Sequence, residues 1–127
     1  MNKQLIIVAS VFGILAVILG AFGAHGLKNL LDPAGIEVWT TAVNYQFYHT
    51  FALLFLALTP ASELKLIKRA ALFFVLGILL FSGSLYLISL KEVLGISSLA
   101  VLGPVTPLGG FCFILGWFTL LLAALKK

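Results

Sequence analysis

The residues of this chain best suited to chemistry lie together in residues 39–51, whose sequence is WTTAVNYQFYHTF. The polar side chains there that bear most on chemistry precede an apolar run, and they are Asn44, Tyr45, Gln46, Tyr48 and His49. An imidazole titrates near neutral pH, so it can carry a proton or bind a ligand. Polar and ionisable groups inside a bilayer are costly, so each needs a partner, a cavity or a function.

Most of these side chains are expected to share one face of a helix. At about 100° per residue, Tyr45, Tyr48 and His49 fall on the same side. Two serines of a later apolar run lie at a similar depth, and we expect this face to look toward them. The predicted cluster occupies the outer half of the bundle and consists of Tyr45, Gln46, Tyr48, His49, Ser82 and Ser84.

The sequence leaves two interpretations of this cluster open. In the first, the side chains hydrogen-bond one another and hold the helices together, at about 0.6–2 kcal/mol per bond. In the second, they line a cavity, open to the outside, that binds a small molecule or a proton through His49. Residues 51–58 are entirely apolar, which argues against a continuous channel.

A separate candidate site involves His25, at the outer end of the first apolar run. Its imidazole could share a metal ion or a proton with Glu37 or Asp32 on the following loop. Two histidines without a His-x-x-x-His spacing and without paired cysteines are a weak metal signal. We therefore predict no metal and no cofactor.

The motifs of common enzyme classes are absent from the sequence. There is no Gly-x-Ser-x-Gly elbow and no Walker-type phosphate loop. All four acidic residues lie between the apolar runs, so a carboxylate-driven pump lacks its usual groups. We therefore predict that the protein is not an enzyme.

The elements that must position these residues follow from the composition. The 127 residues are 62% hydrophobic and 9% charged, and the mean hydropathy is +1.21. A soluble domain is about half apolar and roughly a quarter charged. With so little charge to cover a surface, the chain is predicted to lie in the lipid bilayer as one domain, residues 1–127. The net charge of +4 is spread over short segments, so we predict no nucleic-acid partner.

Four uncharged runs are long enough to cross a bilayer, for which a helix needs about 20 residues. They predict an all-α integral membrane bundle of four transmembrane helices. The first run exceeds the roughly 7–15 apolar residues of a signal-peptide core, so we favour a retained helix. The predicted spans are residues 4–24, 40–58, 70–90 and 108–125.

Two connections between these runs are irregular. We interpret residues 26–38 as a loop, in which Asp32 could cap a short helix beginning at Pro33. Trp39 would then mark the bilayer interface. Residues 93–106 carry no charge and contain a proline, so we interpret them as a partly buried, re-entrant connection.

The distribution of basic residues predicts the orientation. With four spans, Lys28 and Lys91 lie on one side of the membrane. The other basic residues share the opposite side, and they are Lys3, Lys65, Lys68, Arg69, Lys126 and Lys127. The positive-inside rule then places both termini in the cytoplasm.

Small residues recur in the first and last spans and predict close helix contacts. They could pack within the bundle or between copies of the chain. The glycines in question are Gly13, Gly20, Gly23, Gly109, Gly110 and Gly116.

Four motifs together resemble one known family. They are GAFGAHGL at residues 20–27, W-x-x-A-x-x-Y-Q-x-Y-H at 39–49, FSGSLY at 81–86, and TPLGG with GW at 106–110 and 116–117. The chain resembles the small four-helix membrane proteins of unknown function that are related to eukaryotic transmembrane protein 256. The resemblance implies a bacterial plasma (inner) membrane protein and names no reaction, substrate or cofactor.

We therefore predict a multi-pass plasma-membrane protein that has a structural role or binds a small-molecule ligand through the polar cluster. The alternative is a small transporter or proton-coupled carrier that uses His49. Such a carrier would be a homo-oligomer, because four short helices enclose little volume.

Overall fold

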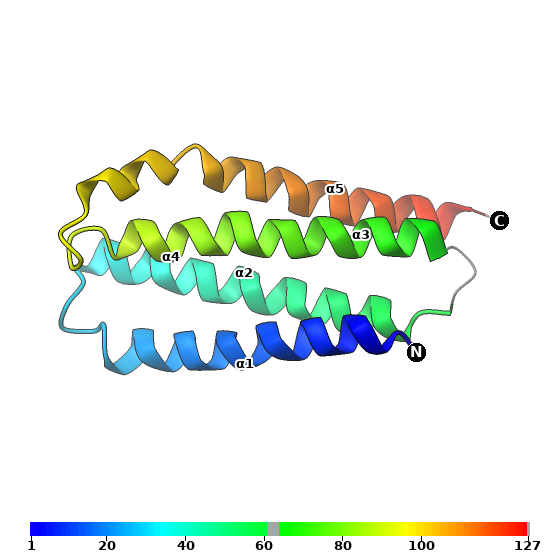
Figure 1. The fold of residues 1–127 in the computed structure, drawn as a ribbon, viewed down its shortest axis with the longest axis horizontal. Coiled ribbons are helices and arrows are strands. Elements are labelled where there is room, and N and C mark those ends of the chain that lie inside the picture. The colour runs from blue at the N-terminus through cyan, green and yellow to red at the C-terminus, as the bar shows by residue number, and fades with distance from the viewer. Residues whose placement is uncertain (61–63, 127) are drawn as a thin grey trace.

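The computed structural model describes residues 1–60 and 64–126, and every regular element among them is a helix. The elements are α1 (Lys3–His25), α2 (Pro33–Leu58), α3 (Leu64–Gly77), the π-helical turn η2 (Ile78–Ser82), α4 (Gly83–Ser89), the 3-10 helix η3 (Ser97–Leu102) and α5 (Val105–Leu125). α3, η2 and α4 follow one another without a break and form one long rod (Figure 1). The predicted all-α architecture is confirmed.

The long helices lie side by side in the order in which they occur in the chain (Figure 1). α1 packs on α2, α2 packs on the rod formed by α3, η2 and α4, and α5 packs on α3 and η2. The N-terminus, the end of α2 and the end of α5 lie at the same end of the molecule. α2 is therefore an inner helix, and its polar side chains can reach neighbours on several sides.

The interior contains two buried apolar clusters. The cluster nearer the termini includes Leu53, Leu56 and Phe74, and the cluster nearer the opposite end includes Leu27 and Trp39. Large apolar side chains also cover the outward faces of α1 and α5. Such faces would promote aggregation in water, whereas in a bilayer they contact lipid.

Three segments of the described residues are long and apolar enough to cross a membrane: Lys3–His25, Lys65–Ser89 and Ser97–Leu125. α2 is not among them, because the polar residues of its first half lower its hydropathy. Several of those polar side chains are buried against the neighbouring helices, so the low hydropathy reflects contacts inside the protein.

The second helix begins within residues 26–38, which the sequence analysis interpreted as a loop. It starts at Pro33, and the Asp32 carboxylate caps it by accepting the Gly35 backbone N–H at 2.7 Å. The alternative of a helix capped by Asp32 is therefore the correct one. Trp39 consequently lies inside α2 and is 3% exposed, so its ring packs within the protein and does not face outward.

The third helix also begins earlier than predicted, at Leu64 rather than at residue 70. Its first turns carry Lys65, Lys68 and Arg69. The long apolar stems of such side chains can lie along a helix while their charged groups reach water. The uncharged run in the sequence therefore begins later than the helix does.

The connection before α5, which the sequence predicted to be partly buried, is mostly exposed in the structure. None of residues 93–106 is buried, and they form turns, the 3-10 helix η3 and the start of α5. Pro104 immediately precedes Val105, the first residue of α5. A proline is tolerated there because the first backbone N–H groups of a helix have no partner within it.

The glycines predicted to pack helices lie at contacts within this chain. Gly13, Gly20 and Gly23 of α1 face α2, whereas those of α5 face η2 and α3. Gly109 is the most constrained, because a Cβ at this position would collide with the backbone of Phe81. The remaining glycines of this set are Gly110 and Gly116. A further glycine that the sequence did not single out, Gly77, leaves room for a phenylalanine ring of α5.

Candidate functional site

Two polar side chains of α2 bind the backbone of α1. The Trp39 indole N–H donates to the carbonyl oxygen of Leu19 at 2.8 Å. Two helical turns further on, the Gln46 side-chain amide donates to the carbonyl oxygen of Phe12 at 2.8 Å. Both side chains are therefore used to join α2 to α1.

Small residues of α1 make these bonds possible. In a helix, the carbonyl of residue i lies beside the side chain of residue i+4. Leu19 is followed four residues later by Gly23, and Phe12 by Ala16. A Cβ at Gly23 would come within 2.5 Å of the Trp39 ring. The close packing of α1 and the polar bonds of α2 thus depend on each other.

Gln46 also accepts a hydrogen bond from α4. The Tyr86 hydroxyl donates to Gln46 Oε1 at 2.7 Å, and the Tyr86 ring packs against Trp39 with centroids 4.7 Å apart. Gln46 is 3% exposed. One amide therefore ties α1, α2 and α4 together and is not accessible to a ligand.

Two serines of the long rod bind other helices. Ser82, in the π-helical turn, donates to the backbone carbonyl of Ala42 at 2.7 Å, which joins η2 to α2. Ser84 and Thr106 lie 2.6 Å apart through their hydroxyl oxygens, which joins α4 to α5. No buried side-chain nitrogen or oxygen among the described residues lacks a hydrogen-bond partner.

His49 joins α2 to α5. Its Nδ1 lies 2.7 Å from the carbonyl oxygen of Tyr45, and its Nε2 lies 3.1 Å from the indole nitrogen of Trp117. A carbonyl oxygen can only accept and an indole N–H can only donate, so the ring is neutral with its proton on Nδ1. The imidazole also stacks on Phe113, with centroids 3.5 Å apart and an interplanar angle of 8°.

A groove of about 810 Å³ runs between α2 and α5 beside this histidine. Tyr45 and Tyr48 on its α2 side are 39% and 57% exposed. Neither tyrosine hydroxyl makes a hydrogen bond with any described residue, in contrast to Tyr86. The lining residues are Tyr45, Tyr48, His49, Phe81, Pro107, Gly110, Phe111, Phe113, Ile114 and Trp117.

The structure divides the predicted polar cluster into two parts. Tyr45, Tyr48 and His49 share one face of α2, and all three line the groove. Gln46, Ser82 and Ser84 do not line it, because their side chains bond to backbone or side-chain groups between other helix pairs. The expected face-to-face arrangement of the tyrosines with the two serines is therefore not what the structure has.

The other walls of the groove could not be predicted from the sequence. Phe81, Phe113 and Trp117 come from η2 and α5, and their proximity to α2 is a tertiary contact. One signal was present: Trp117 lies ten residues after Pro107, as His49 lies ten residues after Trp39. At about 1.5 Å per residue, both pairs span about 15 Å from the end of the molecule at which α2 and α5 begin (Figure 1).

The second candidate site forms no cluster of metal ligands. His25 and Glu37 are both exposed near the ends of α1 and α2. Within residues 1–60 and 64–126, no group of three His, Cys, Asp or Glu side chains is close enough to hold a metal ion. The single cysteine, Cys112, is free and half-buried in α5.

These features together define a helical integral membrane protein. Its apolar outward faces suit lipid, and polar side chains bond between its helices. Residues 19–110 match the family model described as "Protein of unknown function (DUF423)". The chain belongs to this family.

Its relatives are uncharacterised bacterial membrane proteins. "UPF0382 membrane protein YwdK" of Bacillus subtilis is 39% identical over 126 residues, which cover 98% of each chain. A "UPF0382 membrane protein" of Staphylococcus epidermidis is 39% identical over 124 residues, covering 98% of this chain and 97% of the relative. One of Haemophilus influenzae is 38% identical over 126 residues, covering 99% and 96%. No solved structure matches the chain.

Proposed function

We propose that this protein is a non-enzymatic plasma-membrane protein that binds an apolar molecule with a polar end in the groove between α2 and α5. The observation that carries this proposal is the pair of tyrosine hydroxyls, Tyr45 and Tyr48, which have no partner among the described residues. The buried polar side chains around them are all bonded. These two hydroxyls are therefore the polar groups left for a ligand.

The walls of the groove determine the kind of ligand. Phe81, Phe113 and Trp117 present ring surfaces, which favour an apolar body. A hydroxyl in an apolar environment is costly when it has no hydrogen bond, so a polar group on the ligand would be stabilised by the two tyrosines. All the lining residues belong to the helical segments α2, η2 and α5 and none to a loop, so the ligand would enter from the bilayer.

The groups that line the groove are suited to binding a ligand. His49 uses both ring nitrogens, one on the Tyr45 carbonyl and one on the Trp117 indole. No carboxylate lines the groove. A proton on Nε2 would have to displace the Trp117 N–H, so this geometry gives no support to the alternative of a proton carrier that works through His49.

The proposal includes four spans with both termini in the cytoplasm. α2 would also cross the membrane, since three of its polar residues, Gln46, His49 and Thr50, are buried against neighbouring helices. Both termini lie at one end of the molecule (Figure 1), as an even number of spans requires. Among the described residues, that end carries Lys3, Lys65, Lys68 and Arg69, as well as Lys126, which favours the cytoplasmic side. Glu63 and Lys127 lie outside the described residues.

Quenching of tryptophan fluorescence tests the proposed binding. Trp117 lines the groove and is 49% exposed, whereas Trp39 is buried elsewhere. A brominated long-chain alcohol, added to the protein in nanodiscs, should quench Trp117 with a saturable dependence on concentration. The double variant Tyr45→Phe/Tyr48→Phe should weaken this binding about tenfold, because each hydrogen bond contributes about 0.5–1.5 kcal/mol.

Two controls make the result specific. Trp117→Phe should remove the saturable signal. Tyr86→Phe deletes a hydroxyl that bonds Gln46 away from the groove, so it should leave the affinity unchanged. Quenching that rises linearly with the alcohol in all variants would show simple partition into lipid and would contradict the proposal.

A further inference from the structure

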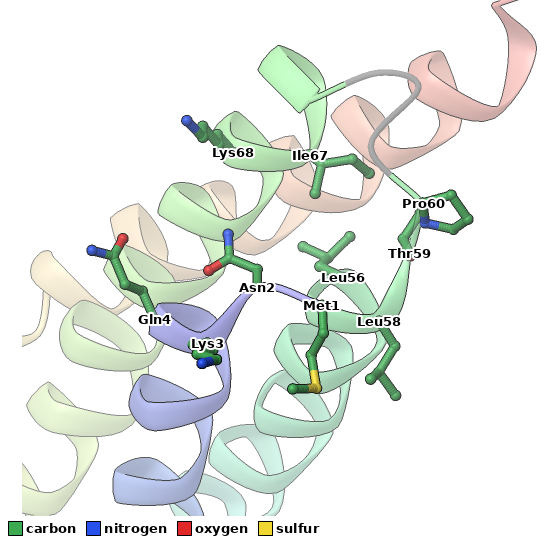
Figure 2. Close-up of a pocket in the computed structure, with 10 residues that line it drawn as sticks. All are labelled: Met1, Asn2, Lys3, Gln4, Leu56, Leu58, Thr59, Pro60, Ile67 and Lys68. Atoms are coloured by element: carbon green, nitrogen blue, oxygen red, sulfur yellow. The ribbon is translucent and has the colours of Figure 1, made fainter.

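A second cavity, of about 670 Å³, lies at the end of the molecule that carries the termini. Figure 2 shows it between the first turn of α1, the end of α2 and the beginning of α3. It is separate from the groove between α2 and α5, and the two share no lining residue.

The cavity has an apolar floor and polar walls. Leu56 and Ile67 are buried and form the floor, where they face each other from α2 and α3 (Figure 2). Asn2 and Gln4 from the start of α1 and Lys68 from α3 line the walls, together with Lys3. This combination suits a ligand with a charged part and an apolar part.

The polar groups of the walls are available as donors. The Asn2 side-chain oxygen caps α1 by accepting the Leu5 backbone N–H at 3.2 Å, which leaves its NH₂ group unused. Neither Lys3 nor Lys68 forms a hydrogen bond or an ion pair with any described residue. The Gln4 side chain likewise has no such partner. Donors and positive charge thus gather here without a protein acceptor among the described residues.

The surrounding charge is positive as well. Lys68 and Arg69 lie three and four residues after Lys65, which are helical spacings at which like charges repel. α1 and α3 contain no acidic residue in their first turns. The acidic residues that the structure describes, Asp32, Glu37 and Glu92, lie at the opposite end of the molecule.

We infer that this cavity binds the headgroup of an anionic phospholipid. The phosphate would lie between Lys3 and Lys68 and accept hydrogen bonds from the Asn2 and Gln4 amides. The acyl chains would leave over the apolar floor and the exposed Leu58 beside it. This apolar part distinguishes a lipid from a free phosphate ion, for which a floor of Leu56 and Ile67 offers nothing.

Thermal unfolding of the full chain in neutral detergent tests this site. Added phosphatidylglycerol should raise the unfolding midpoint more than phosphatidylcholine with the same acyl chains. In the double variant Lys3→Gln/Lys68→Gln, the concentration of phosphatidylglycerol needed for half the effect should rise about thirtyfold, since each lysine near an anionic lipid contributes about a factor of five.

The chain offers a matched control for the loss of charge. Lys28→Gln/Lys91→Gln also removes two positive charges, but at the opposite end of the molecule. This variant should respond to phosphatidylglycerol as the unmodified protein does. Lys3→Arg/Lys68→Arg keeps the charge in the cavity and should retain the effect, which separates loss of the site from a disturbed fold.

Three outcomes would overturn the inference. Equal stabilisation by both lipids would show that the headgroup charge is not recognised. Equal behaviour of the two Lys→Gln pairs would show that binding, if present, is not at this cavity. A midpoint shift produced as well by inorganic phosphate alone would identify a free-anion site and exclude the lipid as the specific occupant.

Discussion

At the scale of single residues, several polar side chains join helices by donating to backbone carbonyls of a neighbouring helix. Gln46 and Trp39 each donate to a carbonyl of α1, and Ser82 donates to a carbonyl of α2. In α1, the residue four positions after each acceptor is small, Gly23 after Leu19 and Ala16 after Phe12, which leaves room for the donor. The small residues of α1 and the polar side chains of α2 that bond to it therefore depend on each other.

Replacing Gln46 tests this interpretation. Gln46→Leu removes the bond to the Phe12 carbonyl and leaves the half-buried Tyr86 hydroxyl without its acceptor. We expect the free energy of unfolding in detergent micelles to fall by about 1–2 kcal/mol. Tyr45→Phe, which deletes a hydroxyl without a described partner, should change it by less than about 0.5 kcal/mol. Equal costs for the two variants would contradict the assignment.

The state of the His49 ring provides a second prediction. Nitrogen NMR of protein labelled in histidine should show one neutral tautomer at neutral pH, with the proton on Nδ1, because both neighbours fix the roles of the ring nitrogens. His25 is exposed and serves as an internal comparison in the same spectrum. An imidazolium signal for His49, or a proton on Nε2, would be inconsistent with the bond from Trp117.

At the scale of the elements, the contact between α5 and the π-helical turn η2 sets one wall of the groove. Phe81 lies in η2 and lines the groove, and its backbone lies against Gly109 of α5. π-helical turns within α-helices are often found at functional sites. Here the turn also contains Ser82, which bonds α2, so the same turn meets both helices of the groove.

Alanine substitutions at two adjacent glycines, Gly109 and Gly110, distinguish the effect of close packing on stability from the effect of helix propensity. Gly109→Ala would place a methyl group on the Phe81 backbone, which cannot move aside as a side chain can, and should destabilise the fold by about 1–3 kcal/mol. A Cβ at Gly110 would lie 3.7 Å from the Phe81 side chain, an ordinary contact. Gly110→Ala should therefore be neutral or stabilising by up to about 1 kcal/mol. Unfolding in detergent that ranks the variants in the reverse order would refute this account of α5.

The bounds of a helix could be predicted from hydropathy where the helix is apolar along its whole length. The first span was expected at residues 4–24, and the structure has the helix α1, Lys3–His25, at this position. The start of α2 could not be found this way, because residues 33–38 precede a polar stretch and are not strongly apolar. The start of α3 was missed because its first turns carry lysine and arginine.

The candidate site could be predicted only in part, for a physical reason. The shared face of Tyr45, Tyr48 and His49 follows from helical periodicity, which is local. The partners of the buried polar residues, such as Trp117 for His49 and Tyr86 for Gln46, depend on the order in which helices pack. Nothing in the local pattern distinguishes a serine facing the groove from one facing a neighbouring carbonyl.

At the scale of the whole molecule, all the long helices run side by side, and the two ends of the bundle differ in charge. In the described residues, the end with the termini is basic, whereas the acidic residues lie at the other end. A protein with this asymmetry has a defined orientation in a membrane. The cavity of Figure 2 lies at the basic end, and the groove lies along the side of the bundle.

Labelling of single cysteines tests this orientation. In a Cys112→Ser background, Lys28→Cys and Glu92→Cys should react with a membrane-impermeant thiol reagent in intact cells. Lys3→Cys and Lys65→Cys should react only after the membrane is opened, because the positive-inside rule places the basic end in the cytoplasm. Labelling of all four positions from outside, or of the opposite pair, would contradict the proposed topology.

The central claim is that the groove between α2 and α5 holds a molecule from the bilayer, and a crystal structure from a lipidic mesophase tests it most directly. The account predicts elongated density against Phe81, Phe113 and Trp117, with its polar end within hydrogen-bond distance of the Tyr45 or Tyr48 hydroxyl. A groove filled instead by a helix of a second copy, or closed by direct contact of α2 with α5, would contradict it.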